Sequence, residues 1–374
     1  MKIVVAMDSF KGSLPAVQAC DIVARALRAV RPEAEVVVRP MADGGEGTAA
    51  ALMAAAGGQW IARTVTGPLP EMRVEAGFVW LPQTRTAVVE MATASGLQLL
   101  APRQQNPLLT TTYGTGELIA GAIEHGAGRI LLAVGGSATV DGGVGAATAL
   151  GWQFLTKEGR DIALGGAAVA TIHTMIPPQA ALGAEVEVLC DVDNPLCGPH
   201  GAAQVYGPQK GATPEMVEML EAGLAHLAKL VKEQLGRDVK DPPGAGAAGG
   251  LAAGAVAFMN ARLVSGIDTV MSHSGLPEAL ADADWVVTGE GCLDEQSLRG
   301  KVVSGVTRIA QQTGAKVAVL AGRVHLWPEQ YRAAGIETAL PCADEEMDTR
   351  DAIANAAALL DKAARRFASA HLCS

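Results

Sequence analysis

Short runs of apolar, largely β-branched residues recur along this chain, and each is followed by a polar loop and then by a segment with helical periodicity. The first runs are residues 3–7 and 35–39. Uninterrupted apolar runs of this length are typical of strands buried on both faces of a parallel sheet. Ser13 is predicted to cap the first helix, whose first turn holds Pro15. The pattern therefore predicts an α/β fold.

The chain is long enough for two domains, because 374 residues exceed the usual domain size of about 100–200 residues. Near Gly67–Pro70 the succession of buried strands and helices gives way to a segment that alternates like a half-exposed strand. The succession of buried strands and helices returns near residue 266. Because the βα units before residue 66 make an undersized sheet, we predict a discontinuous, Rossmann-like parallel-sheet domain (1–66 and 266–374) with an inserted α/β domain (67–265). The predicted strands that follow are 73–80, 86–91, 129–134, 185–190, 283–288, 316–321 and 336–340, and the predicted helices are 115–125, 214–235, 302–313 and 350–371.

Composition excludes several functional classes. The 29 Lys and Arg residues against 39 Asp and Glu residues give a net charge of −10, and no basic cluster is present, so we expect no nucleic-acid binding. The amino-terminal apolar run ends at Asp8 and no apolar stretch reaches 18 residues, so we expect neither a signal peptide nor a membrane span. The cysteines lack metal-binding spacing and are expected to be reduced thiols of a cytoplasmic protein. They are Cys20, Cys190, Cys197, Cys292, Cys342 and Cys373.

Three loops, at 43–48, 135–143 and 288–301, combine glycines with carboxylates between an apolar strand and a helix. Ligands of open α/β sheets bind beyond the carboxyl ends of strands, and helix amino termini attract anions. The carboxylates would repel a phosphate unless a metal stood between them, and Mg²⁺ is commonly held by one or two carboxylates plus substrate phosphates. Cations beside these loops can neutralise developing charge; they are Lys11, Lys210 and Lys301. The combination indicates phosphoryl transfer.

Other motifs are weaker. Asp191 and Asp193 follow a predicted strand and project to the same side of an extended chain. They can hold a metal or accept a hydroxyl proton, and an Asx-turn before Pro195 is an equally good interpretation. No Walker A motif occurs, and the G-x-G-x-x-G at 244–249 follows two prolines instead of a strand, which argues against dinucleotide binding. Residues 135–139 lack the last glycine of a nucleophile elbow.

Eight ordered segments resemble the type-1 family of bacterial glycerate kinases. They extend from the first predicted strand almost to the last predicted helix: 8–13 (Asp-Ser-Phe-Lys-Gly-Ser), 42–48, 111–117, 135–143, 190–198, 205–212, 244–250 and 288–301. Two positions depart from the family pattern, because Met7 and Val303 stand where proline is usual. Neither change removes a charge or a hydrogen-bond donor, so both affect only local loop shape.

The resemblance implies a two-domain α/β kinase that uses ATP and Mg²⁺ to phosphorylate D-glycerate, with its active site in the cleft between the domains. Its product is expected to be 2-phospho-D-glycerate. Carried over residue by residue, the pattern implies catalytic roles for Asp8, Lys11, Asp43, Asp191 and Asp193, the last two also as metal ligands. The implied substrate-binding residues are Ser9, Ser13, Gly44, Gly45, Glu46, Ser137 and Asp141, and the implied cofactor-binding residues are Lys210, Glu290, Asp294, Gln296, Ser297 and Lys301.

Alternative functions remain open at the level of sequence. The same kinase can instead make 3-phosphoglycerate, or it can use another small hydroxy acid as acceptor. A non-catalytic protein that binds an anionic metabolite also fits the glycine loops, although it gives no reason for so many adjacent carboxylates. A dinucleotide-dependent oxidoreductase is the weakest alternative, because its fingerprint is misplaced.

Overall fold

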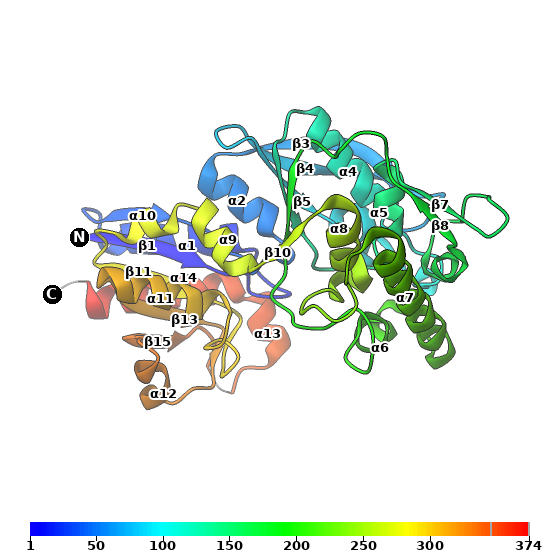
Figure 1. Cartoon of the computed structure of the whole chain (residues 1–374). Coiled ribbons are helices and arrows are strands. Elements are labelled where there is room, and N and C mark those ends of the chain that lie inside the picture. Colours follow the sequence, from blue (N-terminus) through cyan, green and yellow to red (C-terminus); the bar gives the residue numbers. More distant parts are fainter. Residues whose placement is uncertain (345, 373–374) are drawn as a thin grey trace. The chain divides into compact units, whose positions relative to one another are not determined.

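The computed structural model describes residues 1–344 and 346–372 and has a mixed α/β fold with mainly parallel sheets, which confirms the predicted fold class. The chain divides into two compact units (Figure 1). Unit 1 consists of Met1–Asp43, Ala50–Gly58 and the chain from Ile267 onward, and unit 2 consists of Gly44–Ala49 and Gln59–Gly266. No helix in the described part of the chain is long and apolar enough to cross a membrane.

Unit 1 contains a parallel sheet with the strand order β15-β13-β11-β1-β2. Its strands are β1 (Lys2–Met7), β2 (Glu35–Val38), β11 (Trp285–Gly289), β13 (Lys316–Ala321) and β15 (Thr338–Pro341), and β12 (Cys292–Leu293) pairs separately with β14 (Arg323–Val324). The helices are α1 (Ala16–Val30), α2 (Thr48–Ala56, which begins in unit 2), α9 (Gly266–His273, whose first residue belongs to unit 2), α10 (Leu276–Leu280), α11 (Val302–Thr313), α12 (Pro328–Ala333), α13 (Thr349–Ala354) and α14 (Ala356–His371).

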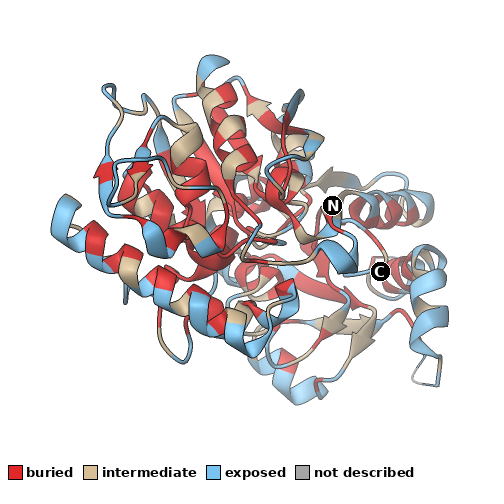
Figure 2. Ribbon diagram, turned by 90° about the vertical axis from the view of Figure 1, so that its right-hand side faces the viewer, coloured by how far each residue is buried: buried red, intermediate tan, exposed pale blue. Residues whose placement is uncertain are grey.

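Helices cover both faces of the unit 1 sheet because its strands are apolar on both sides. Ile3, Val5 and Met7 of β1 pack with α1 and α14, whereas Val4 and Ala6 pack with α9, α10 and α11. This is the period-2 alternation of side chains along a strand. Across the molecule, Figure 2 shows many buried strand residues and helices that carry both buried and exposed residues.

Unit 2 contains a mixed sheet with the strand order β10-β9-β6-β5-β4-β3. Its strands are β3 (Gln59–Thr66), β4 (Arg73–Leu81), β5 (Thr86–Glu90), β6 (Arg129–Ala133), β9 (Glu185–Leu189) and β10 (Arg262–Val264), with the separate hairpin β7 (Gln153–Leu155) and β8 (Thr174–Ile176). In the large sheet, β4 runs antiparallel to both β3 and β5, and the other neighbouring strands are parallel.

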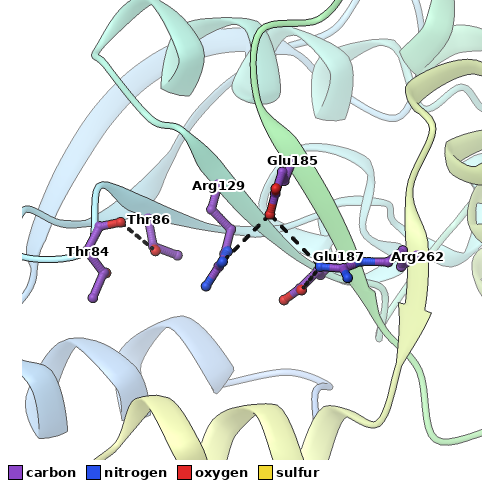
Figure 3. Close-up of polar contacts among 6 residues, drawn as sticks. All are labelled: Thr84, Thr86, Arg129, Glu185, Glu187 and Arg262. Atoms are coloured by element: carbon purple, nitrogen blue, oxygen red, sulfur yellow. Dashed lines mark hydrogen bonds and ion pairs between the residues drawn. The ribbon is translucent and has the colours of Figure 1, made fainter.

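Ion pairs cross three neighbouring strands of this sheet (Figure 3). Glu185 of β9 lies 3.6 Å from Arg129 of β6 and 3.9 Å from Arg262 of β10, and Arg262 also lies 2.7 Å from Glu187. Arg262 and Glu185 are largely exposed, so each pair contributes at most about 1 kcal/mol. The pairs support a register that the buried strand residues already specify.

Two apolar cores stabilise unit 2. Helices α4 (Tyr113–Glu124) and α8 (Leu251–Met259) share one core with the large sheet. The second lies beneath α7 (Pro214–Leu235) and includes the contacting rings of Trp152, Phe154 and Phe258. The remaining elements are α3 (Ala92–Ser95), α5 (Val144–Ala149), α6 (Ala202–Tyr206) and the 3₁₀ turns η1 (Leu97–Leu99), η2 (Pro102–Gln104), η3 (Gly166–Thr171), η4 (Pro208–Lys210) and η5 (Ala247–Gly250).

Three details differ from the sequence-based expectation. Residues 59–66 form β3, which pairs along its whole length with β4, so this segment lies in unit 2, whereas the sequence-based boundary was placed at residue 66. The final helix is two helices, α13 and α14, separated at Asn355. The N-cap of α1 is Pro15, and the Ser13 hydroxyl instead donates to the Phe10 carbonyl at 3.0 Å.

Candidate active site

The strand order of unit 1 reverses beside β1. The chain passes from β1 to β2 on one side, whereas β11, β13 and β15 follow one another on the other side. In open parallel sheets, ligands bind beyond the carboxyl ends of the strands at such a switch point. The Asp8 N–H donates to the Gly289 carbonyl at 2.9 Å, which joins the loops that leave β1 and β11. The fold therefore places the Asp8 and Glu290 loops together.

A cavity of ≈ 400 Å³ opens at this edge of unit 1. It contains predicted catalytic, substrate-binding and cofactor-binding residues from separate parts of the sequence. These are Asp8, Ser9, Lys11, Ser13, Asp43, Glu290, Asp294 and Lys301. The size lies within the range of about 300–1,000 Å³ typical of small-molecule sites. The cavity is the candidate active site of unit 1.

Asp8 is the carboxylate of this cavity best suited to proton transfer. Its side chain follows β1, and the residue is only 9% exposed. Burial raises the pKa of the Asp8 carboxyl to about 7, and the charges of Asp43 and Glu290 act in the same direction. The Ser9 N–H, which donates to Asp8 Oδ1 at 2.6 Å, and the Lys11 ammonium oppose the rise. A carboxylate with a pKa near neutrality can accept a proton efficiently from a hydroxyl group.

Glu290 offers an acceptor to a ligand. The residue lies directly after β11 and is 9% exposed, and burial raises its pKa. Its Oε1 atom is buried and has no hydrogen-bond partner among the described residues. Buried polar atoms in folded proteins are nearly always paired with protein or water, so this atom is available to a donor from a ligand or from water.

The loop at 290–301 is shaped by internal hydrogen bonds. Asp294 Oδ1 accepts from the N–H groups of Gln296 at 2.8 Å and Ser297 at 3.1 Å, and the Ser297 hydroxyl donates to the Cys292 carbonyl at 3.1 Å. Ser297 is fully buried, and neither it nor Gln296 lines the cavity. Their contacts therefore fix the loop that presents Glu290, Asp294 and Lys301.

Asp141 and Lys210 lie inside unit 2. Asp141 is 1% exposed and accepts from the backbone N–H groups of Thr112, Gly143 and Gly145 and from the Thr112 hydroxyl. Burial raises its pKa, against these donors. Lys210 is 2% exposed, and its ammonium donates to Ser137 Oγ and to the Thr139 carbonyl, both at 2.7 Å. Burial lowers the pKa of Lys210 to about 7. Both residues make protein contacts that hold the 135–143 loop.

The loop at 44–48 packs closely on the 135–143 loop within unit 2. A Cβ atom added to Gly135 would lie 2.8 Å from Gly45 Cα, so a side chain at Gly135 would displace that backbone. The Thr48 hydroxyl donates to the Gly45 carbonyl at 2.8 Å. These contacts bring predicted residues Gly44, Gly45 and Glu46 beside the loop that carries Ser137.

Asp191 and Asp193 occupy an exposed loop after β9. Asp191 Oδ1 accepts from the Gly266 N–H at 3.0 Å, a contact with a distant segment that the Asx-turn interpretation did not include. Among residues 1–344 and 346–372, no group of three or more His, Cys, Asp or Glu side chains is placed to hold a metal ion. Five cysteines are free thiols, and Cys373 lies outside the described residues.

The structure adds cavity residues that sequence reasoning missed. Gly322 and Arg323 follow β13, so the rule that ligands bind at strand ends applies to them as well. The apolar residues contributed by α13 and α14 had no comparable signal. Conversely, the glycines of 244–249 are buried packing positions: a Cβ atom at Gly249 would lie 1.9 Å from the Thr139 carbonyl oxygen.

Comparison with known proteins links this geometry to one family. The model of the Glycerate kinase family matches residues 3–372. A glycerate kinase of Halalkalibacterium halodurans is 42% identical over 98% of this chain and 97% of its own length, and the glycerate 2-kinase of Escherichia coli K12 is 44% identical over 86% and 85%. A Salmonella typhimurium LT2 crystal structure with the provisional name glycerate kinase 2 is 41% identical, with a TM-score of 0.88 over 99% of this chain and 98% of its own.

Proposed function

Since this chain belongs to the glycerate kinase family, we propose that it transfers the γ-phosphoryl group of ATP to the 2-hydroxyl of D-glycerate, giving 2-phospho-D-glycerate and ADP. The observation that carries the proposal is the unit 1 cavity, in which a buried carboxylate with a pKa of about 7 shares its walls with two lysines. Phosphoryl transfer depends mainly on positioning and on neutralisation of charge, and this combination provides both.

Asp8 is the proposed general base. It accepts the proton of the glycerate hydroxyl as that oxygen attacks the γ-phosphorus, and the bond from this phosphorus to the bridging oxygen of ATP breaks. Lys11 and Lys301, which line the same cavity, neutralise the charge on the transferring group and on the leaving ADP. The unpaired Oε1 atom of Glu290 accepts a hydrogen bond from a hydroxyl group of a ligand.

Asp191 and Asp193 are the proposed ligands of Mg²⁺. Their carboxylates belong to an exposed loop and supply the hard oxygen donors that Mg²⁺ prefers, so the residue types fit this ion. When bound, Mg²⁺ supplies further neutralisation of phosphate charge.

Ser9, Ser13 and Ser137 are the proposed partners of glycerate. The location of the active site between the domains, and residence in the cytoplasm, stay predictions.

The test is phosphorus NMR of a mixture of the protein, D-glycerate, ATP and Mg²⁺. We expect the resonance of 2-phosphoglycerate to grow in step with that of ADP, and omission of D-glycerate to abolish both. A 3-phosphoglycerate resonance would correct the acceptor oxygen while leaving the kinase proposal in place. Absence of any ADP-coupled product with active, folded protein would overturn the proposed function.

A further inference from the structure

The unit 1 cavity has two chemically different parts. The residues that follow β1 and β11 are mostly charged or polar, with Phe10 and Gly291 as exceptions, whereas α13 and α14 contribute an apolar wall made of Ala352, Ile353, Ala356 and Leu359. Glycerate has only three carbons, which carry a carboxylate and two hydroxyls, and so offers no group that matches an apolar wall. The wall therefore fits a ligand other than glycerate, or an apolar group of a larger ligand.

Helix α13 is placed at the cavity without being part of the core. It has no buried residue, and Ile353 is 44% exposed. The segment is nevertheless fixed: Asp348 Oδ1 caps the helix by accepting from the Arg350 N–H at 2.8 Å, and the cavity residue Arg323 donates to the Met347 carbonyl at 2.6 Å. Ile353 therefore lines the cavity without contributing to the core, whereas Ala356 and Leu359 of α14 also pack against the unit 1 core.

Given the proposed function, on which this inference rests, we propose that the wall formed by Ala352, Ile353, Ala356 and Leu359 binds the adenine ring of ATP. A nucleotide carries its negative charge at one end and a flat, uncharged ring at the other. The cavity lining has the complementary composition, because lysines line it together with the apolar wall. Alanine side chains at two of the four positions leave room for a planar ring, and apolar lining with a few polar groups is typical of such sites.

The proposal is tested by calorimetric titration of ADP, and separately of pyrophosphate, into the unliganded protein. Ile353→Asn makes the wall polar without adding charge. Ala352→Phe keeps the wall apolar but fills the space beside it in the cavity. Each variant is expected to bind ADP at least 10-fold more weakly than the wild type and to bind pyrophosphate within twofold of it. Ile176→Asn is the matched control, because Ile176 is 40% exposed on β8 in unit 2, and its ADP affinity is expected to stay within twofold.

The outcomes separate this inference from the proposed function. Wild-type protein that binds ADP, with affinity unchanged in both wall variants, would overturn the adenine site and leave the kinase activity intact. Equal losses of ADP and pyrophosphate binding would also overturn it, because the charged part of the cavity would then be affected. Wild-type protein that binds no ADP would overturn both proposals. Circular dichroism of each variant confirms that it is folded.

Discussion

Asp8 combines burial with the charges of neighbouring carboxylates, and this combination makes its protonation sensitive to pH near neutrality. A general base works only when deprotonated, so kcat/KM for D-glycerate is expected to fall about tenfold per pH unit below about pH 7. Asp8→Asn is expected to lower kcat at least ~100-fold at pH 8. Coupled ADP assays between pH 5.5 and 8.5 measure both effects. The control is Asp21→Asn on the exposed side of α1, which is expected to keep wild-type turnover. Wild-type turnover by the Asp8→Asn protein would rule out Asp8 as the general base.

The same carboxyl predicts a pH-dependent stability. The pKa of Asp8 is about 7 in the folded protein against an ordinary value of 3.8, so between these values the folded state holds a proton that the unfolded state releases. Wild-type stability is therefore lost as pH rises from about 4 to 7, whereas the amide of the Asp8→Asn variant has no charge to bury. The stability of Asp8→Asn relative to wild type is expected to increase by roughly 4 kcal/mol between pH 4 and pH 8. Urea unfolding at both pH values measures this difference, and an unchanged difference contradicts the prediction.

Lys210 is expected to matter for folding more than its sequence context suggests. Lys210→Met removes the two hydrogen bonds to Ser137 and Thr139 and leaves buried Asp141 without its neighbouring cation. We expect a loss of roughly 3 kcal/mol in unfolding free energy. Lys229→Met, which removes an exposed ion pair with Glu233, is the control and is expected to change stability by less than about 0.5 kcal/mol. A Lys210→Met protein as stable as this control would contradict the prediction.

At the residue scale, sequence patterns located the cavity side chains that follow strands, such as Asp8 and Glu290, because strand ends can be read from apolar runs. They did not separate residues that line the cavity from those that shape its loops. Ser297 and Asp141 look equally polar in the sequence, yet both are buried and bonded to protein groups. Burial of this kind depends on tertiary contacts that no local pattern records.

At the element scale, the closeness of β11 and β13 depends on Gly289. A Cβ atom at this position would lie 1.9 Å from the Leu320 carbonyl oxygen and 2.6 Å from Met7 Cε. Gly289→Ala is therefore expected to destabilise the protein by about 1–3 kcal/mol. Gly128→Ala is the control, because no heavy atom lies within 4 Å of the added Cβ, and it is expected to change stability by less than about 0.5 kcal/mol. The midpoints of urea unfolding compare the two, and equal midpoints would argue against the close contact.

Elements with strong periodicity were predicted well. The predicted bounds of α7, α11 and β13 are those of the structure, because each has a clear apolar pattern and α7 and α11 end at glycines in the left-handed region. Strand β3 was missed because it is largely exposed, so its sequence lacks an apolar face. The break between α13 and α14 was missed because its residues, Ala354 to Ala356, include no glycine or proline.

At the scale of the whole molecule, the chain enters and leaves each compact unit more than once. The β1 and β2 strands pair with each other, but β1 also needs β11, which is supplied by the carboxyl-terminal part. A fragment of residues 1–58 is therefore expected to be unfolded, whereas a fragment of residues 59–266, which holds the complete sheet and both cores of unit 2, is expected to unfold cooperatively. Far-UV circular dichroism during heating distinguishes the two, and a cooperative transition in the short fragment would contradict this expectation.

The pairing of β1 with β11 also has a consequence during synthesis. The opening strand leaves the ribosome nearly 280 residues before its central neighbour does, an interval of roughly 14 to 56 s at about 5–20 residues per second. Throughout that time the apolar strand β1 lacks the neighbouring strand that will bury it, while the middle of the nascent polypeptide can already fold. Chaperones that bind nascent chains should accordingly bind this exposed strand and release it once the last hundred residues have emerged.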